Sequence, residues 1–474
     1  MRRMACFLVT AWVLTVSNAA AKETPPATDA SPLIEYVQQA DPAYKWEVAQ
    51  TIPGAIAETT VIRLTSQSWR TKEDVDRTAW EHWLVVVKPA KLTTNKAFLI
   101  VGGSGNDRAM PDGANAVVSQ IAAATGSIVA ELRMVPNQPL IFHGDGKPRK
   151  EDDLIGYGWA QFLETGDPTW LPRLPMVKSV ARAMDCLQEW SAQQDAKIEK
   201  FVVAGASKRG WTTWMIGAAD PRVEAIVPIV IDVLNVEKTM AHHAAVYGFW
   251  ATAVGNYYQH DILQRPNHPR MKELYRIEDP YFYVDRLTMP KYIVNGSGDQ
   301  FFCPDSSQFY FDDLKGEKHL RYVPNADHSV DGSIDAVTSI VAFYQMLLAN
   351  RPRPETKWTF EDDGSIRVTS DTSPKRVKLW QATNPKARDF RVATIGKAYA
   401  ETELQAESDG SYVARIETPE KGWSASFVEL EYDSGGAFPF KVSTSVRVLP
   451  ETAPFAGVDL AEIPYEPNMK LQGK

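Results

Sequence analysis

The chain has 474 residues, of which 44% are hydrophobic and 23% charged, and its formal net charge at pH 7 is −8. This length favours two or more domains over one. The acidic balance argues against a nucleic-acid partner, because a nucleic-acid-binding protein usually carries a basic patch or stripe.

The first residues have the pattern of a secretory signal peptide. Met1-Arg2-Arg3 precede an apolar run from Met4 to about Val16, and small residues follow at Ala19-Ala20-Ala21. We predict a signal peptide at 1–21, cleaved after Ala21, and hence an exported protein that is periplasmic or extracellular. We predict no membrane span, since this run is short and no later run approaches the roughly 20 apolar residues that a spanning helix needs.

Two cysteines lie beyond this leader, Cys186 and Cys303. So few cysteines exclude a disulfide-rich scaffold and a cysteine zinc site. A single bridge between them and two separate buried thiols both stay open, because spacing alone does not show that two positions meet.

Near-continuous apolar runs predict a sheet that is covered on both faces, as in α/β proteins. The expected strands are 59–65, 83–87, 97–101, 126–132, a run that starts at 201, 223–231, 291–294 and 319–323. Apolar residues at three- and four-residue spacing predict helices at 115–124, 176–193 and 335–348. The segment 137–175 is rich in Gly, Pro and aromatic residues, and we expect a long ordered loop with a functional role.

Two segments lie outside this alternating pattern. A mostly helical insertion at about 235–286 is unusually aromatic. We expect it to cover the site as a cap, with most of its aromatic residues packed inside the cap itself. After a linker at 350–354, short alternating segments separated by Asp, Gly, Ser and Pro turns favour an antiparallel β-sandwich of immunoglobulin-domain size.

The most informative motif is Gly205-Ala206-Ser207-Lys208-Arg209-Gly210, where a strand pattern meets a turn and becomes helical. Small residues before the serine allow the sharp strand-to-helix turn of a nucleophile elbow, which presents the hydroxyl above the carboxyl end of a sheet. Serine is also a preferred helix N-cap residue, so a capping role for Ser207 is the alternative.

A serine hydroxyl needs an imidazole to take its proton and a carboxylate to orient that imidazole. Asp299 lies in a glycine-containing turn after the strand 291–294, and His328 follows the strand 319–323. We favour His328 because His319 falls within a strand pattern and His242-His243 within a helix. Asp232, which ends the strand 223–231, is the rival acid, and we favour Asp299 because its glycine neighbours suit a strained turn.

Two backbone N–H groups would complete this set as an oxyanion hole. They are expected from Lys208, directly after the nucleophile, and from Gly103 in the glycine-rich run after the strand 97–101. The chain order Ser207, Asp299, His328 is that of α/β-hydrolases. We therefore predict an α/β-hydrolase domain at 22–352 with its cap at about 235–286, followed by a β-sandwich domain at 353–474.

Two basic residues directly follow the expected nucleophile. Lys208 and Arg209 could attract an anionic group of the substrate, or could simply cover the helix surface with their long side chains. Trp211, in the same helix, is a candidate substrate contact or a packing residue. No metal or cofactor is expected, because His-Glu-x-x-His is absent and the acidic groups 151–153 and 361–363 are typical of solvated turns.

With these motifs in place, the chain resembles the PhoPQ-activated pathogenicity-related protein family of secreted α/β-hydrolase-like proteins. The likeness rests on Val101-Gly102-Gly103, the loop 159–170, the elbow 205–211, Gly296-Ser297-Gly298-Asp299 and Asp327-His328. It implies an exported protein with a hydrolase domain and a C-terminal sandwich, and no particular substrate. The elbow is also similar to that of glucuronoyl esterases, in which an arginine directly after the serine helps to stabilise the oxyanion; here lysine takes that place.

The sequence thus predicts a secreted serine hydrolase, an esterase or a peptidase, that forms an acyl-enzyme on a small-molecule ester, a carbohydrate ester or a peptide. The alternative is a non-catalytic secreted binding or signalling protein on the same scaffold. The sequence leaves the oligomeric state open.

Overall fold

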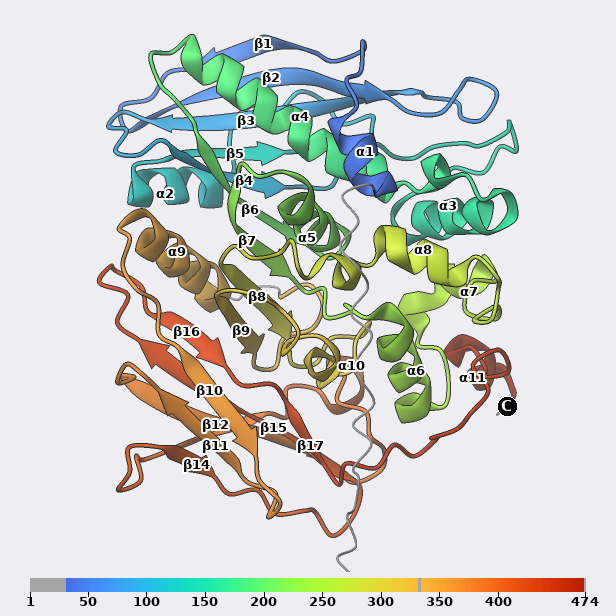
Figure 1. The fold of residues 1–474 in the computed structure, drawn as a ribbon, viewed down its shortest axis with the longest axis vertical. Coiled ribbons are helices and arrows are strands. Elements are labelled where there is room, and N and C mark those ends of the chain that lie inside the picture. Colours follow the sequence, from blue (N-terminus) through green and yellow to red (C-terminus); the bar gives the residue numbers. More distant parts are fainter. Residues whose placement is uncertain (1–30, 331–333, 473–474) are drawn as a thin grey trace, which may run out of the picture.

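The computed structural model describes residues 31–330 and 334–472, so the predicted signal peptide at 1–21 lies outside the described residues. In Figure 1 the N-terminal part forms a large sheet with helices around it, and the C-terminal part forms smaller sheets at the opposite end of the molecule.

A nine-stranded mixed sheet forms the centre of the N-terminal part, in the order β1-β2-β3-β5-β4-β6-β7-β8-β9. Neighbours from β1 to β5 in this order are antiparallel, and those from β5 to β9 are parallel. The strands are β1 (Lys45–Ile52), β2 (Ala57–Ser68), β3 (Ala79–Pro89), β4 (Lys96–Val101), β5 (Ile128–Leu132), β6 (Lys200–Ala206), β7 (Val223–Ile229), β8 (Lys291–Gly296) and β9 (Lys318–Val323). This is an α/β-hydrolase-like core.

Helices bury both faces of this sheet. One face packs against α1 (Pro32–Gln38), α4 (Arg173–Ala192) and α5 (Lys208–Ala219), and the other against α2 (Ala116–Thr125) and α9 (Ile334–Leu348). Successive strand residues point to opposite faces, so Leu99 belongs to the first core and Phe98 to the second. Burial on both sides explains why the parallel strands have near-continuous apolar sequences.

The predicted strands and helices of this core are confirmed, but the long loop predicted at 137–175 is wrong. It contains α3 (Glu151–Thr165) and the short helix η1 (Pro168–Trp170), so Trp159 is helical. Glycines in α3 weaken its helical signal in the sequence. Packing nevertheless requires glycine at position 158, because a Cβ there would overlap Pro172 and the carbonyl oxygen of Trp170.

The insertion between β7 and β8 is helical, as the sequence predicts. It comprises α6 (Val236–Tyr247), η2 (Thr252–Val254), α7 (Gly255–Gln259), α8 (Met271–Glu278) and η3 (Pro280–Tyr283). A further short helix, η4 (Ser306–Phe309), lies between β8 and β9. Met240 and Tyr257 of this insertion line the pocket that contains Ser207, so the insertion covers the elbow.

The C-terminal part consists of antiparallel sheets. One has the order β10-β11-β14, and the other has the order β13-β12-β15-β16 with β17 paired to β15. The elements are β10 (Thr356–Phe360), β11 (Ile366–Ser370), β12 (Arg376–Asn384), α10 (Val392–Ile395), β13 (Ala400–Glu403), β14 (Tyr412–Ala414), β15 (Trp423–Tyr432), β16 (Phe440–Ser443), β17 (Arg447–Leu449) and α11 (Glu466–Gln472). Ile366 and Val368 of the first sheet share a core with Val377 and Leu430 of the second.

The two parts are joined by a buried polar contact. Arg321 of β9 is fully buried and binds Glu429 of β15 and Asp335 of α9, each at 2.5 Å. The backbone N–H of Tyr322 also donates to Ser443 Oγ of β16 at 2.8 Å. Because removing one partner of a buried ion pair leaves an uncompensated charge, this contact ties the C-terminal sheets to the hydrolase-like core.

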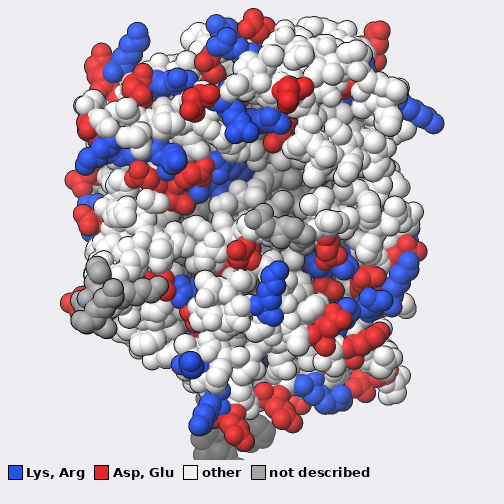
Figure 2. All heavy atoms as spheres, turned by 180° about the vertical axis from the view of Figure 1, so that it is seen from behind, with Lys and Arg blue, Asp and Glu red and all other residues white. Residues whose placement is uncertain are grey.

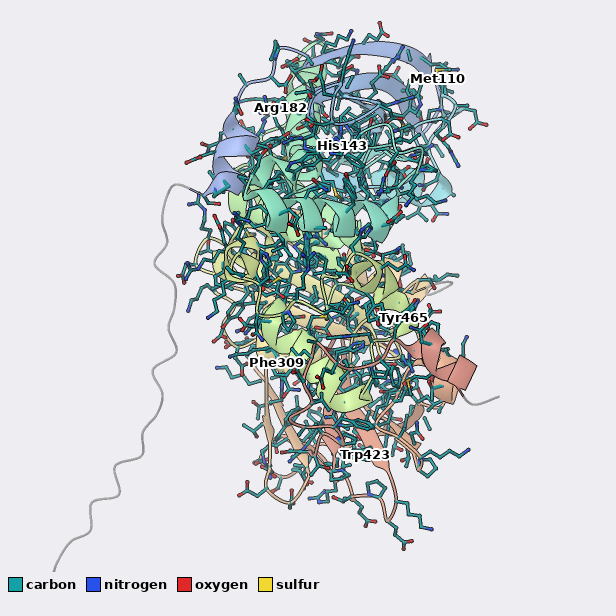
Figure 3. The ribbon with its side chains drawn as sticks, turned by 90° about the vertical axis from the view of Figure 1, so that its right-hand side faces the viewer. Met110, His143, Arg182, Phe309, Trp423 and Tyr465 are labelled. Carbon is teal, nitrogen blue, oxygen red and sulfur yellow. The ribbon has the colours of Figure 1, made fainter. Side chains whose placement is uncertain are left out.

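The end of the chain leaves the C-terminal sheets and returns to the cap. Figure 3 shows Trp423 within these sheets and Tyr465 beside the cap helices. The backbone N–H of Trp250 donates to Pro464 O at 2.8 Å, and the Tyr465 ring stacks on Tyr258 at 5.1 Å between centroids. The predicted domain boundaries, 22–352 for the hydrolase domain and 353–474 for the β-sandwich domain, stay predictions. The last residues of the second segment contact the cap.

Cys186 and Cys303 are separate buried thiols, so the bridge that the sequence left open is not formed.

Over the described ranges, no helix is both long and apolar enough to span a bilayer. Acidic and basic side chains are interspersed over the face shown in Figure 2, which is hollowed near its middle.

Candidate active site

Ser207 lies on a strained turn between β6 and α5. Its φ of 59° and ψ of −125° are unusual for a residue with a Cβ atom. Its side chain makes no N-cap hydrogen bond to α5, so the capping alternative is not what the structure shows. A Cβ on Gly205 would lie 2.5 Å from Arg209 O, so the sharp turn requires glycine there. This is the backbone geometry of a nucleophile elbow.

Two hydrogen bonds connect Ser207 to the loops after β8 and β9. The Ser207 Oγ lies 2.7 Å from His328 Nε2, and the Asp299 Oδ2 lies 2.7 Å from His328 Nδ1. Asp299 is 5% exposed, which keeps water from its bond with the imidazole. The structure therefore brings together the three side chains that the sequence singles out, in the geometry of a serine, a general base and an orienting acid.

Asp232, the rival acid, has other partners. Tyr310 donates to its Oδ1 at 2.7 Å and Tyr322 to its Oδ2 at 2.6 Å. Burial raises the pKa of Asp232 to about 7, although the two tyrosine hydrogen bonds act in the opposite direction. Asp299, and not Asp232, is the carboxylate hydrogen-bonded to His328.

The two expected oxyanion donors flank this site. Lys208 begins α5 directly after Ser207, and Gly103 follows β4, which lies beside β6 in the sheet. Within the described residues, neither backbone N–H donates to a protein acceptor. Both are therefore free to donate to a reacting oxygen.

The cations after Ser207 are compensated by carboxylates of α3. Lys208 Nζ lies 3.0 Å from Asp152 Oδ2 and 3.1 Å from Glu151 Oε2, and Arg209 Nη2 lies 2.6 Å from Glu151 Oε1. Burial disfavours the ionised form of Glu151, but Arg209 and Lys208 outweigh this and lower its pKa to about 2. The interpretation of 151–153 as a solvated turn was wrong, since these residues begin α3, Glu151 and Asp152 bind the elbow's cations, and Asp153 pairs with His260.

A small, mainly apolar pocket opens at Ser207 and His328. Its volume is about 70 Å³. The cap, helix α5 and the segments after β7 and β8 supply its apolar lining, which includes Trp211, Ile231, Val236, Met240, Val254 and Phe301. Trp211 is 5% exposed and its indole N–H donates to Glu278 O at 2.6 Å, so it both packs and lines the pocket.

The family model described as PhoPQ-activated pathogenicity-related protein matches residues 33–391. The chain belongs to this family. It is also 40% identical over 453 residues to autocrine proliferation repressor protein A of Dictyostelium discoideum, covering 90% of this chain and 92% of that protein.

Solved structures of esterases are similar to this member of the family at low identity. Acetyl xylan esterase 1 from Thermoanaerobacterium sp. JW/SL YS485 has 16% identity and a TM-score of 0.48, over 67% of this chain and 91% of the esterase. An S-formylglutathione hydrolase from Agrobacterium tumefaciens has 14% identity and a TM-score of 0.39, over 64% of this chain and 99% of the hydrolase.

One group of potential metal ligands lies in the described part of this family member, and none of its residues lines the pocket at Ser207. One ligand atom each from His242, Cys303 and Asp305 lies within 4.8 Å of the others. Asp305 also accepts from Arg388 Nη2 at 2.7 Å, and burial raises the pKa of the Cys303 thiol. A guanidinium beside a protonated thiol disfavours a bound cation, so we assign no metal here.

Proposed function

We propose that the mature protein is an exported serine hydrolase that cleaves an ester or amide bond through an acyl-enzyme on Ser207. The observation that carries this proposal is the pair of 2.7 Å hydrogen bonds from Ser207 through His328 to Asp299, on an elbow with φ of 59°. Neither bond is needed for the fold of the sheet, whereas both are needed to activate a serine hydroxyl.

Each residue has a defined part in the proposed reaction. The Ser207 Oγ attacks the carbonyl carbon while His328 Nε2 takes its proton, and Asp299 stabilises the resulting imidazolium. The N–H groups of Lys208 and Gly103 would bind the oxyanion of the tetrahedral intermediate. His328 then protonates the leaving group, which departs and leaves the acyl group on Ser207. A water molecule gives a proton to His328 and attacks the acyl carbon, and His328 returns the proton to Ser207 Oγ as the acid is released.

The pocket and the charges around Ser207 limit the size, polarity and charge of the substrate. The pocket beside it is small and apolar, so it would take an apolar group of a small ester, a carbohydrate ester or a peptide, with Trp211 as one contact. Lys208 and Arg209 already bind Glu151 and Asp152. An anionic substrate group would therefore compete with carboxylates in place, and we assign Arg209 to holding the oxyanion loop rather than to substrate.

The direct test is hydrolysis of a panel of p-nitrophenyl esters and fluorogenic peptides by the purified mature protein. We expect turnover of at least one substrate and its loss in Ser207→Ala. Lys238→Ala is a matched control, because Lys238 is an exposed residue of α6 that does not line the pocket. Turnover that persists in Ser207→Ala would contradict the proposal.

A signalling role on the same scaffold is the second candidate, and the name of the 40% identical relative favours it. This role predicts that wild-type protein and Ser207→Ala slow the proliferation of Dictyostelium discoideum cells equally. If only the wild-type protein slows proliferation, any such effect depends on hydrolysis.

A further inference from the structure

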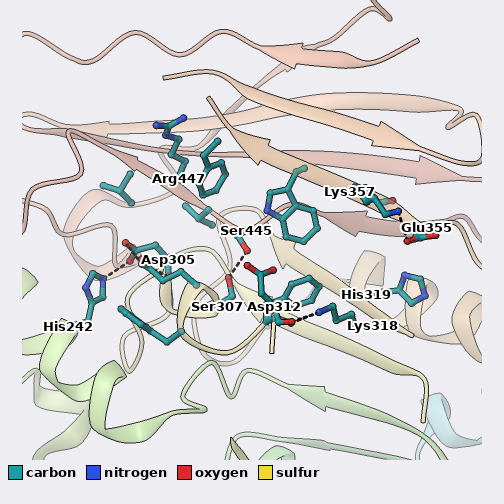
Figure 4. A pocket seen from close by; sticks show the side chains of 18 of the residues that line it. His242, Asp305, Ser307, Asp312, Lys318, His319, Glu355, Lys357, Ser445 and Arg447 are labelled. Atoms are coloured by element: carbon teal, nitrogen blue, oxygen red, sulfur yellow. Dashed lines mark hydrogen bonds and ion pairs between the residues drawn. The ribbon is translucent and has the colours of Figure 1, made fainter. Parts of the chain in front are cut away.

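A second and much larger cavity lies between the hydrolase-like core and the C-terminal sheets (Figure 4). Its volume is about 990 Å³, and it shares no lining residue with the pocket at Ser207. Its walls come mainly from the segments 305–319, 353–360 and 445–453. Helix α6 lies between the two, with Met240 lining the Ser207 pocket and His242 the larger cavity. This volume is at the upper end for small-molecule sites.

Most charged side chains of these walls are compensated by one another; among the described lining residues, Asp312 and Lys318 form no ion pair. Asp305 accepts from His242 at 2.9 Å and from Arg388 at 2.7 Å. The other ion pairs of the walls are Glu317 with Arg353 and His319, Lys357 with Glu355, and Arg447 with Glu451. A charged ligand would find no free counter-charge in these pairs, and its desolvation would go uncompensated. The walls therefore favour a neutral ligand.

Aromatic rings form part of the lining. The rings of Trp358 and Phe311 lie 5.2 Å apart at 32°, and Phe360, on the same strand as Trp358, is 39% exposed. Within the described residues, no acceptor binds the indole N–H of Trp358. A partly exposed tryptophan with an apolar face and an open donor suits a ligand that is apolar on one side and polar at its edge.

Hydrogen-bonding groups lie beside these rings. The buried hydroxyls of Ser307 and Ser445 bond to each other in the cavity wall at 3.0 Å (Figure 4). Gln308, the next residue after Ser307, is exposed. No hydrogen bond from the described part of the chain reaches the exposed carboxylate of Asp312. A sugar ring has an apolar face and a polar edge. An aromatic ring bordered by hydrogen-bond donors and acceptors matches both.

We propose that this interdomain cavity binds a neutral oligosaccharide, with a sugar ring against Trp358 and hydroxyls bonded to Asp312 and the Trp358 N–H. The proposal concerns binding only and does not depend on chemistry at Ser207. It gives the C-terminal sheets a role, since β10 and the β17 region supply one side of the cavity.

The test is calorimetric titration of the full mature chain carrying Ser207→Ala, so that no probe is consumed. The probes are xylohexaose, cellohexaose, mannohexaose and maltohexaose, with hexagalacturonate and hexaproline as contrasts. We expect at least one neutral hexasaccharide to bind and neither contrast to do so. Trp358→Ala should weaken that binding about tenfold or more. Trp380→Ala, on β12 outside the cavity, should leave it unchanged.

Three results would overturn the proposal: no neutral hexasaccharide binds, a contrast binds instead, or Trp358→Ala binds as well as its parent. Circular dichroism and thermal unfolding check that Trp358→Ala is folded. If it is not, Trp358→Phe replaces it, because it keeps one aromatic ring while it removes the indole N–H and part of the ring face. It should still weaken binding a few-fold, and undiminished binding would contradict the assigned contact.

Discussion

The guanidinium of Arg209 occupies the space beside Gly103 that any side chain at that position would need. A Cβ on Gly103 would lie 2.5 Å from Arg209 Nη2. The guanidinium cannot easily give way, because it binds both oxygens of Glu151, at 2.6 and 2.8 Å, and Val135 O at 2.5 Å. The elbow and the proposed oxyanion loop are thus packed directly against each other.

Gly103→Ala should therefore damage catalysis more than folding. The added methyl must displace either the loop or the Arg209 guanidinium, and so moves a proposed oxyanion donor. Loss of one such donor lowers kcat by about 100-fold or more. Steady-state kinetics on the best ester will measure this. Gly113→Ala is the control, since its Cβ would meet only an Ile52 methyl at 3.9 Å. Equal kcat in both variants would show that Gly103 does not position a donor.

Substitution of the two candidate acids, Asp299 and Asp232, should have very different effects on hydrolysis. Asp299→Asn breaks the bond that orients His328, and we expect kcat to fall by about 10⁴-fold, as when a triad carboxylate loses its charge. Asp232→Asn should keep most of the activity, because Asp232 binds Tyr310 and Tyr322 and not the imidazole. If Asp232→Asn were the more damaging of the two, our assignment of the acid would be wrong.

The stability of the protein should depend on pH through Asp232. Its pKa is raised from 3.8 to about 7 on folding, chiefly by burial. The protonated side chain therefore supports the fold fully below about pH 4, and this support is lost as pH rises towards 7. Asparagine mimics the neutral acid and does not titrate. The unfolding free energy of Asp232→Asn minus that of the wild type should therefore increase from pH 4 to pH 7 and stay constant above pH 7. Urea unfolding across this range measures it, and a flat difference would contradict the raised pKa.

The cavity beside Ser207 should limit the length of an acyl chain. Its volume of about 70 Å³ is well below the roughly 150 Å³ of a cavity that admits benzene. We expect p-nitrophenyl acetate and butyrate to be cleaved faster than the octanoate. Met240→Ala removes a lining side chain of the cap and should shift the preference towards longer chains. An octanoate preference in the wild-type protein would mean that the acyl group binds elsewhere.

Local sequence patterns were sufficient for the parts of the site that depend on single turns. Ser207, Asp299 and His328 each follow a strand with a strong apolar pattern, and parallel strands bring their carboxyl ends to one edge of the sheet. The order of the three residues along the chain then fixes the fold class. Pattern and order together predicted the core and the contacts of the three side chains.

Contacts between segments distant in the chain were not predictable in this way. Glu151 and Asp152 lie more than fifty residues before Lys208, and the sequence gives no sign that they meet. The return of Tyr465 to the cap is also invisible, because it depends on a stacking contact with Tyr258 and on close approach to Gly255. Such contacts are decided by tertiary packing, which leaves no local period in the sequence.

The central claim is that His328 activates Ser207 as a nucleophile. Its most direct test is labelling of the purified mature protein with a fluorophosphonate probe, followed by mass spectrometry of the labelled peptide. We predict one labelled residue, Ser207, and no labelling in Ser207→Ala or His328→Ala variants whose circular dichroism matches the wild type. A folded wild-type protein that leaves Ser207 unlabelled would contradict the account.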